Sequence, residues 1–218
     1  MKSKTAAFFL SFLFLLNACA LAWADKSGNI ADHFQQSFTY EAKGKYGPAL
    51  DSVLKILQID PKDYTANLRA GWLNYLKGSY EDSLFYYNKA LSLAPDAIEP
   101  RLGLTLPMMG LKKWRDTDAE AHKVLKIDPK NYFAMSRLAF SLFSQDRYGE
   151  AERYYRELIS LYPSDIEMKL GLGWTLLRMG KKERAKSYFA EVLRVSRNNE
   201  NAAAGMEEVQ GKYRPSAE

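Results

Sequence analysis

The tripeptide Ile59-Asp60-Pro61 returns as Ile127-Asp128-Pro129 and, in altered form, as Leu161-Tyr162-Pro163. Pro95 completes the series, because the prolines at 61, 95, 129 and 163 are each separated by 34 residues. Four prolines in strict register indicate an internal repeat, and a fixed period of this length is typical of stacked helical units. We therefore divide the chain into units that end two residues after each proline: 30–63, 64–97, 98–131, 132–165 and 166–199.

Three positions, counted from the first residue of each 34-residue unit, keep their residue type. Position 20 is small in every unit: Ala49, Ser83, Thr117, Ala151 and Ala185. Position 24 is mostly large and apolar: Val53, Tyr87, Ala121, Tyr155 and Phe189. Position 17 is aromatic except in the last unit: Tyr46, Tyr80, Trp114, Tyr148 and Lys182.

With this period, closing proline and small position 20, the chain resembles the tetratricopeptide-repeat (TPR) family, whose unit is a helix, a turn and a second helix. The resemblance covers residues 30–199 and implies an all-α fold, a right-handed α-α superhelical solenoid of five repeats. The fifth unit has Arg197 in place of the proline. We expect residues 200–213 to form a polar helix that caps the last repeat, and residues 214–218 to be disordered.

Residues at the unit boundaries predict where helices start and stop. Glycines at 44, 78 and 180 end first helices where a left-handed residue is favoured. An acid or amide follows each proline, where its oxygen can cap the next helix: Asp63, Asp96, Asn131 and Asp165.

The first 24 residues have the pattern of an export signal. Two lysines precede an uncharged apolar run from Ala6 to Leu16, and Ala22-Trp23-Ala24 forms a cleavage site. We expect the mature chain to start at Asp25, with residues 25–29 disordered, and to act in the periplasm. In the alternative, Cys19 is the acylated first residue of a lipoprotein anchored to a bacterial membrane.

Charge gives no indication of a nucleic-acid partner. The chain has 31 basic and 26 acidic residues, but two of the lysines lie in the signal, so the mature chain carries a formal charge of only +3. A near-balanced chain lacks the basic excess that phosphate backbones attract. We expect membrane association only through a partner or through a lipidated Cys19.

Apolar side chains recur along one face of each first helix, at three- and four-residue steps. In the TPR family, positions 2, 5, 9, 12 and 13 line a concave groove that binds peptides or helices. Carried over to this chain, the resemblance places the following residues there: Phe34, Phe38, Leu68, Trp72, Tyr75, Leu102, Leu106, Met109, Phe133, Phe140, Phe143, Leu170, Trp174 and Leu177.

A second interpretation assigns this stripe to the core between helices, because aromatic residues at helical spacing usually pack inside. A third combines the two, with position 5 packing and positions 9 and 12 reaching the groove. Position 4 is mostly polar here, whereas the family often has a large apolar residue at this point. The first helices could therefore be rotated about their axes.

Catalytic and metal sites need clustered nucleophiles, bases or ligands. After Cys19 the chain has no cysteine, and its two histidines, His33 and His122, are far apart in the sequence. We expect His122 to be a solvated surface residue. The sequence predicts no enzyme activity, no cofactor and no metal site.

These features favour a scaffold or adaptor of the bacterial cell envelope that binds a protein or peptide partner. The candidate anchors are Trp72, Tyr75, Phe140, Phe143 and Trp174, because large aromatic residues concentrate binding energy. The alternative is a glycan-binding module of a polysaccharide secretion system, in which the same rings stack on sugar faces.

Overall fold

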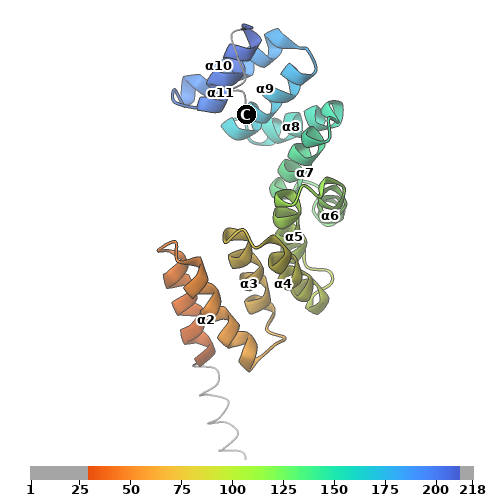
Figure 1. The fold of residues 1–218 in the computed structure, drawn as a ribbon. Coiled ribbons are helices and arrows are strands. Elements are labelled where there is room, and N and C mark those ends of the chain that lie inside the picture. Colours follow the sequence, from red (N-terminus) through yellow and green to blue (C-terminus); the bar gives the residue numbers. More distant parts are fainter. Residues whose placement is uncertain (1–28, 212–218) are drawn as a thin grey trace, which may run out of the picture. The chain divides into compact units, whose positions relative to one another are not determined.

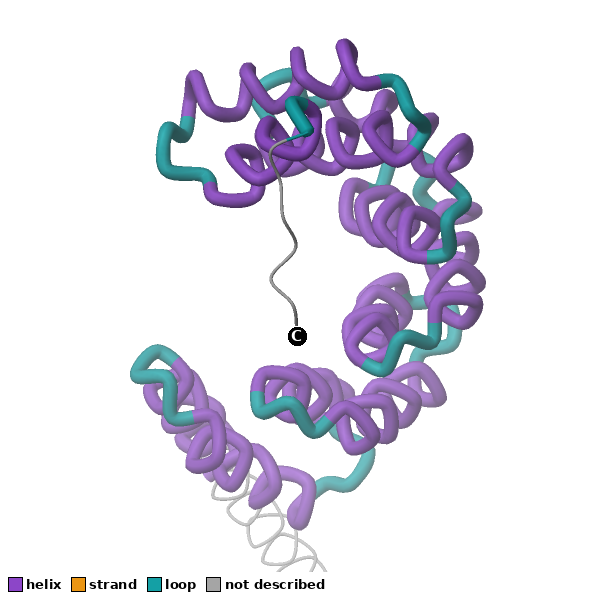
Figure 2. Tube along the Cα trace, turned by 45° about the horizontal axis from the view of Figure 1, so that its top comes forward, coloured by secondary structure: helices purple, strands orange, loops and turns teal. Residues whose placement is uncertain are grey.

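The structure, a computed structural model, describes residues 29–211 of the chain. They form two compact units, which meet in sequence between Pro95 and Asp96 (Figure 1). Helices joined by short loops make up both units, and the described residues contain no strand (Figure 2). The predicted all-α fold is confirmed. The signal segment, Cys19 and the whole of the predicted C-terminal tail, residues 214–218, lie outside the described residues.

The described part of the first unit consists of two helical hairpins. A helix over residues 29–41 is followed by α2 (Tyr46–Ile59), α3 (Tyr64–Leu76) and α4 (Tyr80–Leu93). Helices α2 and α3 pack together, as do α3 and α4.

The second unit begins with α5 (Ile98–Gly110) and α6 (Trp114–Ile127). It continues with α7 (Tyr132–Ser144), α8 (Tyr148–Leu161), α9 (Ile166–Arg178), α10 (Lys182–Val195) and α11 (Glu200–Val209). Consecutive helices pack against one another, and α5, α7, α9 and α11 also contact one another in turn. The first helices of successive repeats therefore lie side by side and form one face of this unit.

Side-chain caps fix where most first helices begin. Asp63 accepts a hydrogen bond from the amide of Ala66 at 2.7 Å, and Asn131 caps α7 in the same way. Asp165 accepts bonds from two amides of α9. The predicted cap at Asp96 is wrong: Ala97 is the N-cap of α5 and supplies no side-chain bond. Asp96 directly follows its proline, whereas the other three capping residues come two residues after theirs. Its oxygen therefore lies one residue too early in the repeat to cap the next helix.

The residue that ends the turn after each first helix has a left-handed backbone conformation in all five 34-residue repeats. Gly44, Gly78 and Gly180 have φ values of 69°, 77° and 75°, as the cap prediction required. Lys112 and Asp146 occupy the same position in the third and fourth repeats, with φ values of 54° and 59°. An L-residue is strained in this region, whereas glycine is not.

The core follows the repeat. Positions 20, 24 and 27 of the second helices are at most 4% exposed, and they are Ala49, Val53, Ile56, Ser83, Tyr87, Ala90, Thr117, Ala121, Val124, Ala151, Tyr155, Leu158, Ala185, Phe189 and Val192. These helices are too short to be stable alone, and burial of this apolar stripe between them stabilises the helical conformation.

Aromatic rings at position 24 lie directly against glycine backbones. A Cβ atom added to Gly71 would lie 2.8 Å from the ring of Tyr87, and one added to Gly173 would lie 2.7 Å from Phe189. The Phe189 ring is also close to Gly205 of α11, at 2.5 Å by the same measure. Phe189 thus joins the fifth repeat to the helix that caps it.

Two arginines instead connect first helices through hydrogen bonds. Arg69 donates to the hydroxyl of Ser37 at 2.8 Å, and Arg137 donates to the hydroxyl of Thr105 at 2.9 Å. Each pair is separated by 32 residues, so the two bonds are equivalent contacts in different repeats. Arg137 also donates to the carbonyl of Leu102 at 2.5 Å.

Candidate functional site

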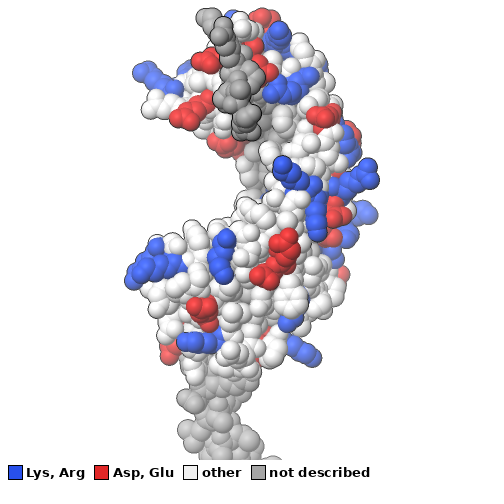
Figure 3. Space-filling model, viewed as in Figure 1, with Lys and Arg blue, Asp and Glu red and all other residues white. Residues whose placement is uncertain are grey.

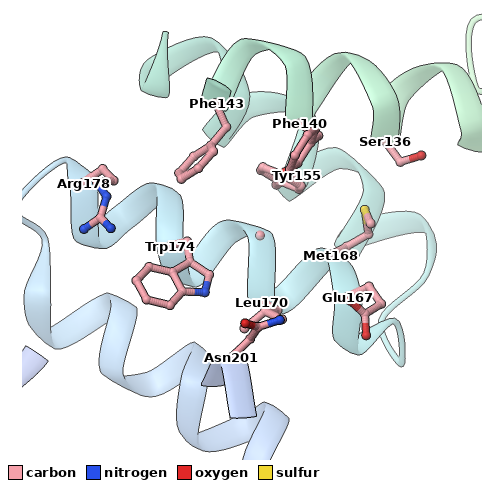
Figure 4. Close-up of a pocket in the computed structure, with 11 residues that line it drawn as sticks. Ser136, Phe140, Phe143, Tyr155, Glu167, Met168, Leu170, Trp174, Arg178 and Asn201 are labelled. Atoms are coloured by element: carbon pink, nitrogen blue, oxygen red, sulfur yellow. The ribbon is translucent and has the colours of Figure 1, made fainter. Parts of the chain in front are cut away.

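A pocket of about 470 Å³ opens on the first-helix face of the second unit (Figure 4). Helices α7, α8, α9 and α11 all contribute to it. Its lining consists of Ser136, Phe140, Phe143, Tyr155, Glu167, Met168, Leu170, Gly171, Trp174, Arg178 and Asn201. This volume lies within the range of sites that hold small ligands or single peptide segments. We call it the α7–α9 pocket.

The walls of the pocket are aromatic because positions 9 and 12 face it. Phe140 and Phe143 project from α7, and Trp174 projects from α9 across the opening (Figure 4). Phe140 is 45% exposed although it is a large apolar residue. Partly exposed aromatic rings that gather around one concavity are typical of interaction surfaces.

Each wall ring is supported by another ring outside the pocket. Phe140 packs against Trp114 with 6.0 Å between centroids, and Phe143 packs against Tyr148 at 5.5 Å. Trp174 contacts Phe189 in the same edge-on manner, at 5.3 Å. These contacts limit the rotamers of the walls before any ligand binds, which lowers the entropy lost on binding.

Tyr155 of α8 forms the floor. It is 4% exposed, and its ring lies against Gly171 of α9. Burial raises the pKa of the Tyr155 phenol, so it remains a neutral hydrogen-bonding group throughout the physiological pH range.

The charged residues of the pocket lie at opposite ends of α9. Arg178 donates to Glu208 of α11 at 2.5 Å, and its guanidinium carbon lies 5.3 Å from the ring centroid of Trp174. Glu167, at the other end, is exposed and forms no ion pair with any residue that the structure describes. Asp165 lies beside it and accepts a hydrogen bond from the Tyr132 hydroxyl at 2.6 Å. The α9 N-terminal end of the pocket is therefore acidic.

In the first unit, the predicted groove residues belong to a polar network. Trp72 donates its indole proton to Glu41 at 2.6 Å, and Glu41 forms a 2.7 Å ion pair with Arg69. The guanidinium of Arg69 lies 3.7 Å from the ring centroid of Phe38. The Tyr75 ring is 5.7 Å from Trp72, between centroids. Phe38 and Trp72 thus already have partners within the unit.

The remaining predicted residues vary in exposure. Phe133 is 55% exposed, with Arg137 above its ring at 5.4 Å. Leu177 is 7% exposed and belongs to the core. The half-buried members are Phe34, Leu68, Leu102, Leu106 and Met109. Of the fourteen predicted residues, the α7–α9 pocket gathers four: Phe140, Phe143, Leu170 and Trp174.

Several pocket residues were not predicted as part of a site. The sequence pattern places Tyr155 in the repeat core alone and gives no role to Arg178 or Asn201. The signal for Tyr155 was present, because Gly171 follows it by sixteen residues, and a glycine leaves room for a ring. Nothing in the local sequence indicates that Asn201 of the capping helix reaches the pocket.

Among residues 29–211, no group of three or more His, Cys, Asp or Glu side chains is placed to hold a metal ion. No helix in that range is long and apolar enough to span a bilayer. His122 is exposed on α6, as predicted. Basic and acidic side chains are interspersed on the visible face of each unit (Figure 3).

Two family models, both described as tetratricopeptide repeat, match residues 32–98 and 142–208, more than half of the chain in total. The chain belongs to the TPR family.

Solved TPR structures agree with this fold. The MamA protein aligns with a TM-score of 0.67 at 18% identity over 88% of this chain and 99% of MamA. A TPR protein from Parabacteroides merdae aligns with a TM-score of 0.74 at 15% identity over 85% of this chain and 75% of that one.

Among curated proteins, the TPR chain is similar to the type IV pilus assembly protein PilF of Pseudomonas aeruginosa. The two are 28% identical over 160 residues, which cover 71% of this chain and 62% of PilF. The chain thus spans less than two thirds of the length of this relative. TPR proteins generally mediate protein–protein interactions, so binding to a protein partner is the function that the family assigns to this chain.

Proposed function

We propose that this TPR chain is a non-catalytic adaptor of the bacterial cell envelope that holds a peptide segment of a protein partner in the α7–α9 pocket. The observation that carries the proposal is the convergence of Phe140, Phe143 and Trp174 on one opening. Similarity to a pilus assembly protein supports the envelope setting.

The pocket has the composition that peptide recognition requires. Large aromatic side chains in a desolvated recess supply most of the binding energy at protein interfaces, and a few polar groups set orientation. Here the aromatic walls surround the opening, and Ser136, Asn201 and Glu167 supply polar groups at its margin.

In-cell photocrosslinking tests the proposal. A photoreactive amino acid at Ser136 should crosslink to a discrete protein partner, which mass spectrometry of the adduct identifies. The Trp174→Ala substitution in the same chain should reduce that adduct about tenfold or more, because loss of a central aromatic anchor costs about 2 kcal/mol or more. An unchanged adduct would remove the pocket from the proposal.

Phe85→Ala is the matched control. Phe85 is 53% exposed on α4, where it packs on Tyr86 and lies under Lys89, and it does not line the pocket. The substitution removes a similar exposed aromatic area, so the adduct at Ser136 should persist.

The glycan alternative is tested with the same chain. Changing Trp72 and Trp174 to alanine should abolish capture of the protein partner if the rings bind peptide. Loss of binding to envelope polysaccharide, with the protein partner retained, would favour sugar recognition instead.

Export and processing form a separate part of the proposal. Cleavage after Ala24 gives a periplasmic chain that starts at Asp25, whereas acylation gives a lipid-modified Cys19. Cell fractionation and intact mass of the purified chain distinguish the two, and Cys19→Ser should change the mature mass pattern only in the second case. Recovery of the unprocessed chain in the cytoplasm would remove the envelope assignment.

A further inference from the structure

The two charged residues that α9 contributes to the pocket differ in their pairing, so the two ends of the pocket should attract different parts of a ligand. Arg178 already has Glu208 as its counter-ion, and its guanidinium also lies over the Trp174 ring. Glu167 has no counter-ion among residues 29–211, and Asp165 adds a second carboxylate near it. A ligand therefore meets a neutralised cation at one end of the pocket and the unpaired Glu167 carboxylate, with Asp165 behind it, at the other.

The helix dipole does not cancel this acidic end. The N-terminus of α9 carries a partial charge of about +0.5, and Asp165 already accepts hydrogen bonds from the amides of Glu167 and Met168. The two carboxylates exceed the partial charge of the helix. The nearest lysine in sequence, Lys169, is engaged with Glu191 at 2.7 Å.

The aromatic end of the pocket suits an apolar side chain better than a cation. A positive group between Phe143 and Trp174 would lie close to the Arg178 guanidinium, which already occupies the neighbourhood of the indole ring. An aliphatic or aromatic side chain avoids this repulsion and fills the space between the wall rings.

We propose that the α7–α9 pocket selects a peptide segment in which an apolar or aromatic anchor is accompanied by a basic residue, the anchor between Phe143 and Trp174 and the base beside Glu167. This inference rests on the proposed peptide-binding function and specifies its partner. Glu167 and Trp174 are seven residues apart on α9, about 10 Å along the helix. About three residues of extended chain span that distance.

Three blocked pentapeptides test the proposal: KGSFG, EGSFG, which reverses the charge, and KGSAG, which lacks the anchor. The readout is the NMR signal of the Trp174 indole, assigned with Trp174→Phe, as each peptide is titrated into the full chain. KGSFG should bind about two- to five-fold tighter than EGSFG at low salt, the range expected for an exposed ion pair. The preference should shrink at 0.5 M salt, and KGSAG should bind more weakly than KGSFG.

Charge reversal in the protein gives the sharpest comparison. Glu167→Lys should invert the order, so that EGSFG binds tighter than KGSFG. Glu183→Lys is the matched control: Glu183 is also an exposed acid in the first turn of its helix, α10, and it does not line the pocket. That variant should keep the wild-type order.

The outcomes separate this inference from the proposed function. Binding that depends on Trp174 but has the same charge preference in wild type and Glu167→Lys would overturn the basic-residue requirement and leave peptide binding intact. No response of the Trp174 signal to any peptide at millimolar concentration would overturn both.

The chain's own residues 212–218 contain Tyr213 between Lys212 and Arg214, a sequence of the same chemistry. If the pocket instead takes a separate partner, as proposed, a chain that ends at Gly211 should give the same Trp174 signal as the full chain. If removal of the segment shifts that signal in the direction opposite to KGSFG binding, the occupant is this segment, and the partner assignment is wrong.

Discussion

The phenol ring of Tyr155 lies on the backbone of Gly171, so close that a Cβ atom at residue 171 would be 2.5 Å from the nearest ring carbon. The same ring is the floor of the α7–α9 pocket. Packing between the fourth and fifth repeats and the shape of the pocket thus depend on one contact.

Gly171→Ala should destabilise the chain and change the pocket together. The added methyl group must displace a buried ring, and overpacking of this kind costs about 1–3 kcal/mol. Denaturant unfolding measures the loss. Gly149→Ala on α8 is the control, because a Cβ atom there meets nothing within 4 Å and alanine is the better helix former. Equal stability of the two variants would contradict the contact.

Lys112→Gly should stabilise the second unit. Lys112 has a φ of 54°, and a left-handed L-residue costs about 1–2 kcal/mol, of which glycine recovers part after its own entropy loss. We expect about 0.5–1 kcal/mol of added stability in urea unfolding. Gly180→Ala, at the same turn position two repeats later, should have the opposite sign. A loss of stability in Lys112→Gly would show that the lysine side chain has a role that its backbone strain does not reveal.

Tyr132 gives a pH-dependent prediction. Burial, and then the hydrogen bond to Asp165, raise the pKa of Tyr132 from the ordinary tyrosine value of 10.0 to about 12. The folded state therefore keeps a proton that the unfolded state loses between these two values. The stability contributed by this group is complete below pH 10 and falls as the pH rises toward 12.

Tyr132→Phe should remove this part of the pH dependence. Between pH 9 and pH 11 the melting temperature of wild type should fall more than that of the variant. Ultraviolet titration of the tyrosines should lose one late-titrating group. Parallel melting curves for the two proteins would mean that the hydrogen bond to Asp165 does not persist in solution.

Arg69→Met should destabilise the first unit by about 1–3 kcal/mol, because Ser37 and Glu41 lose a buried charged partner. The fluorescence of Trp72 should change as well, since Glu41 accepts the indole proton. Arg115→Met, at an exposed position on α6, should have little effect on unfolding. If both substitutions cost the same, the network around Arg69 does not contribute to stability.

The sequence predicted the repeated hairpin well, because helix stacking imposes a period that prolines and small residues make visible. It did not predict how neighbouring repeats fit together. Tyr155 and Phe189 are each followed sixteen residues later by a glycine, Gly171 and Gly205, that makes room for the ring. Where position 24 is small, at Val53 and Ala121, the residue sixteen positions on is an arginine that bonds to the preceding first helix. Such pairs are a property of two packed repeats and not of either one.

From the sequence one could predict that aromatic residues of the first helices form the candidate site, but not which of them are free to do so. The family positions include Phe140, Phe143 and Trp174, which line the α7–α9 pocket, so this part of the predicted set stays a prediction with a concavity behind it. They could not indicate that Glu41 and Arg69 would engage Trp72 and Phe38 in the first unit. Those contacts depend on side-chain pairs 31 residues apart, which no single motif contains.

The capping helix has two roles that cannot be separated. Asn201 at its start lines the pocket, and Glu208 near its end neutralises Arg178. A chain shortened before α11 would leave the Arg178 guanidinium beside the indole without its counter-ion, so the aromatic end of the pocket would favour an acidic group while Glu167 remained at the other end. The element that terminates the repeat array is therefore also a specificity determinant.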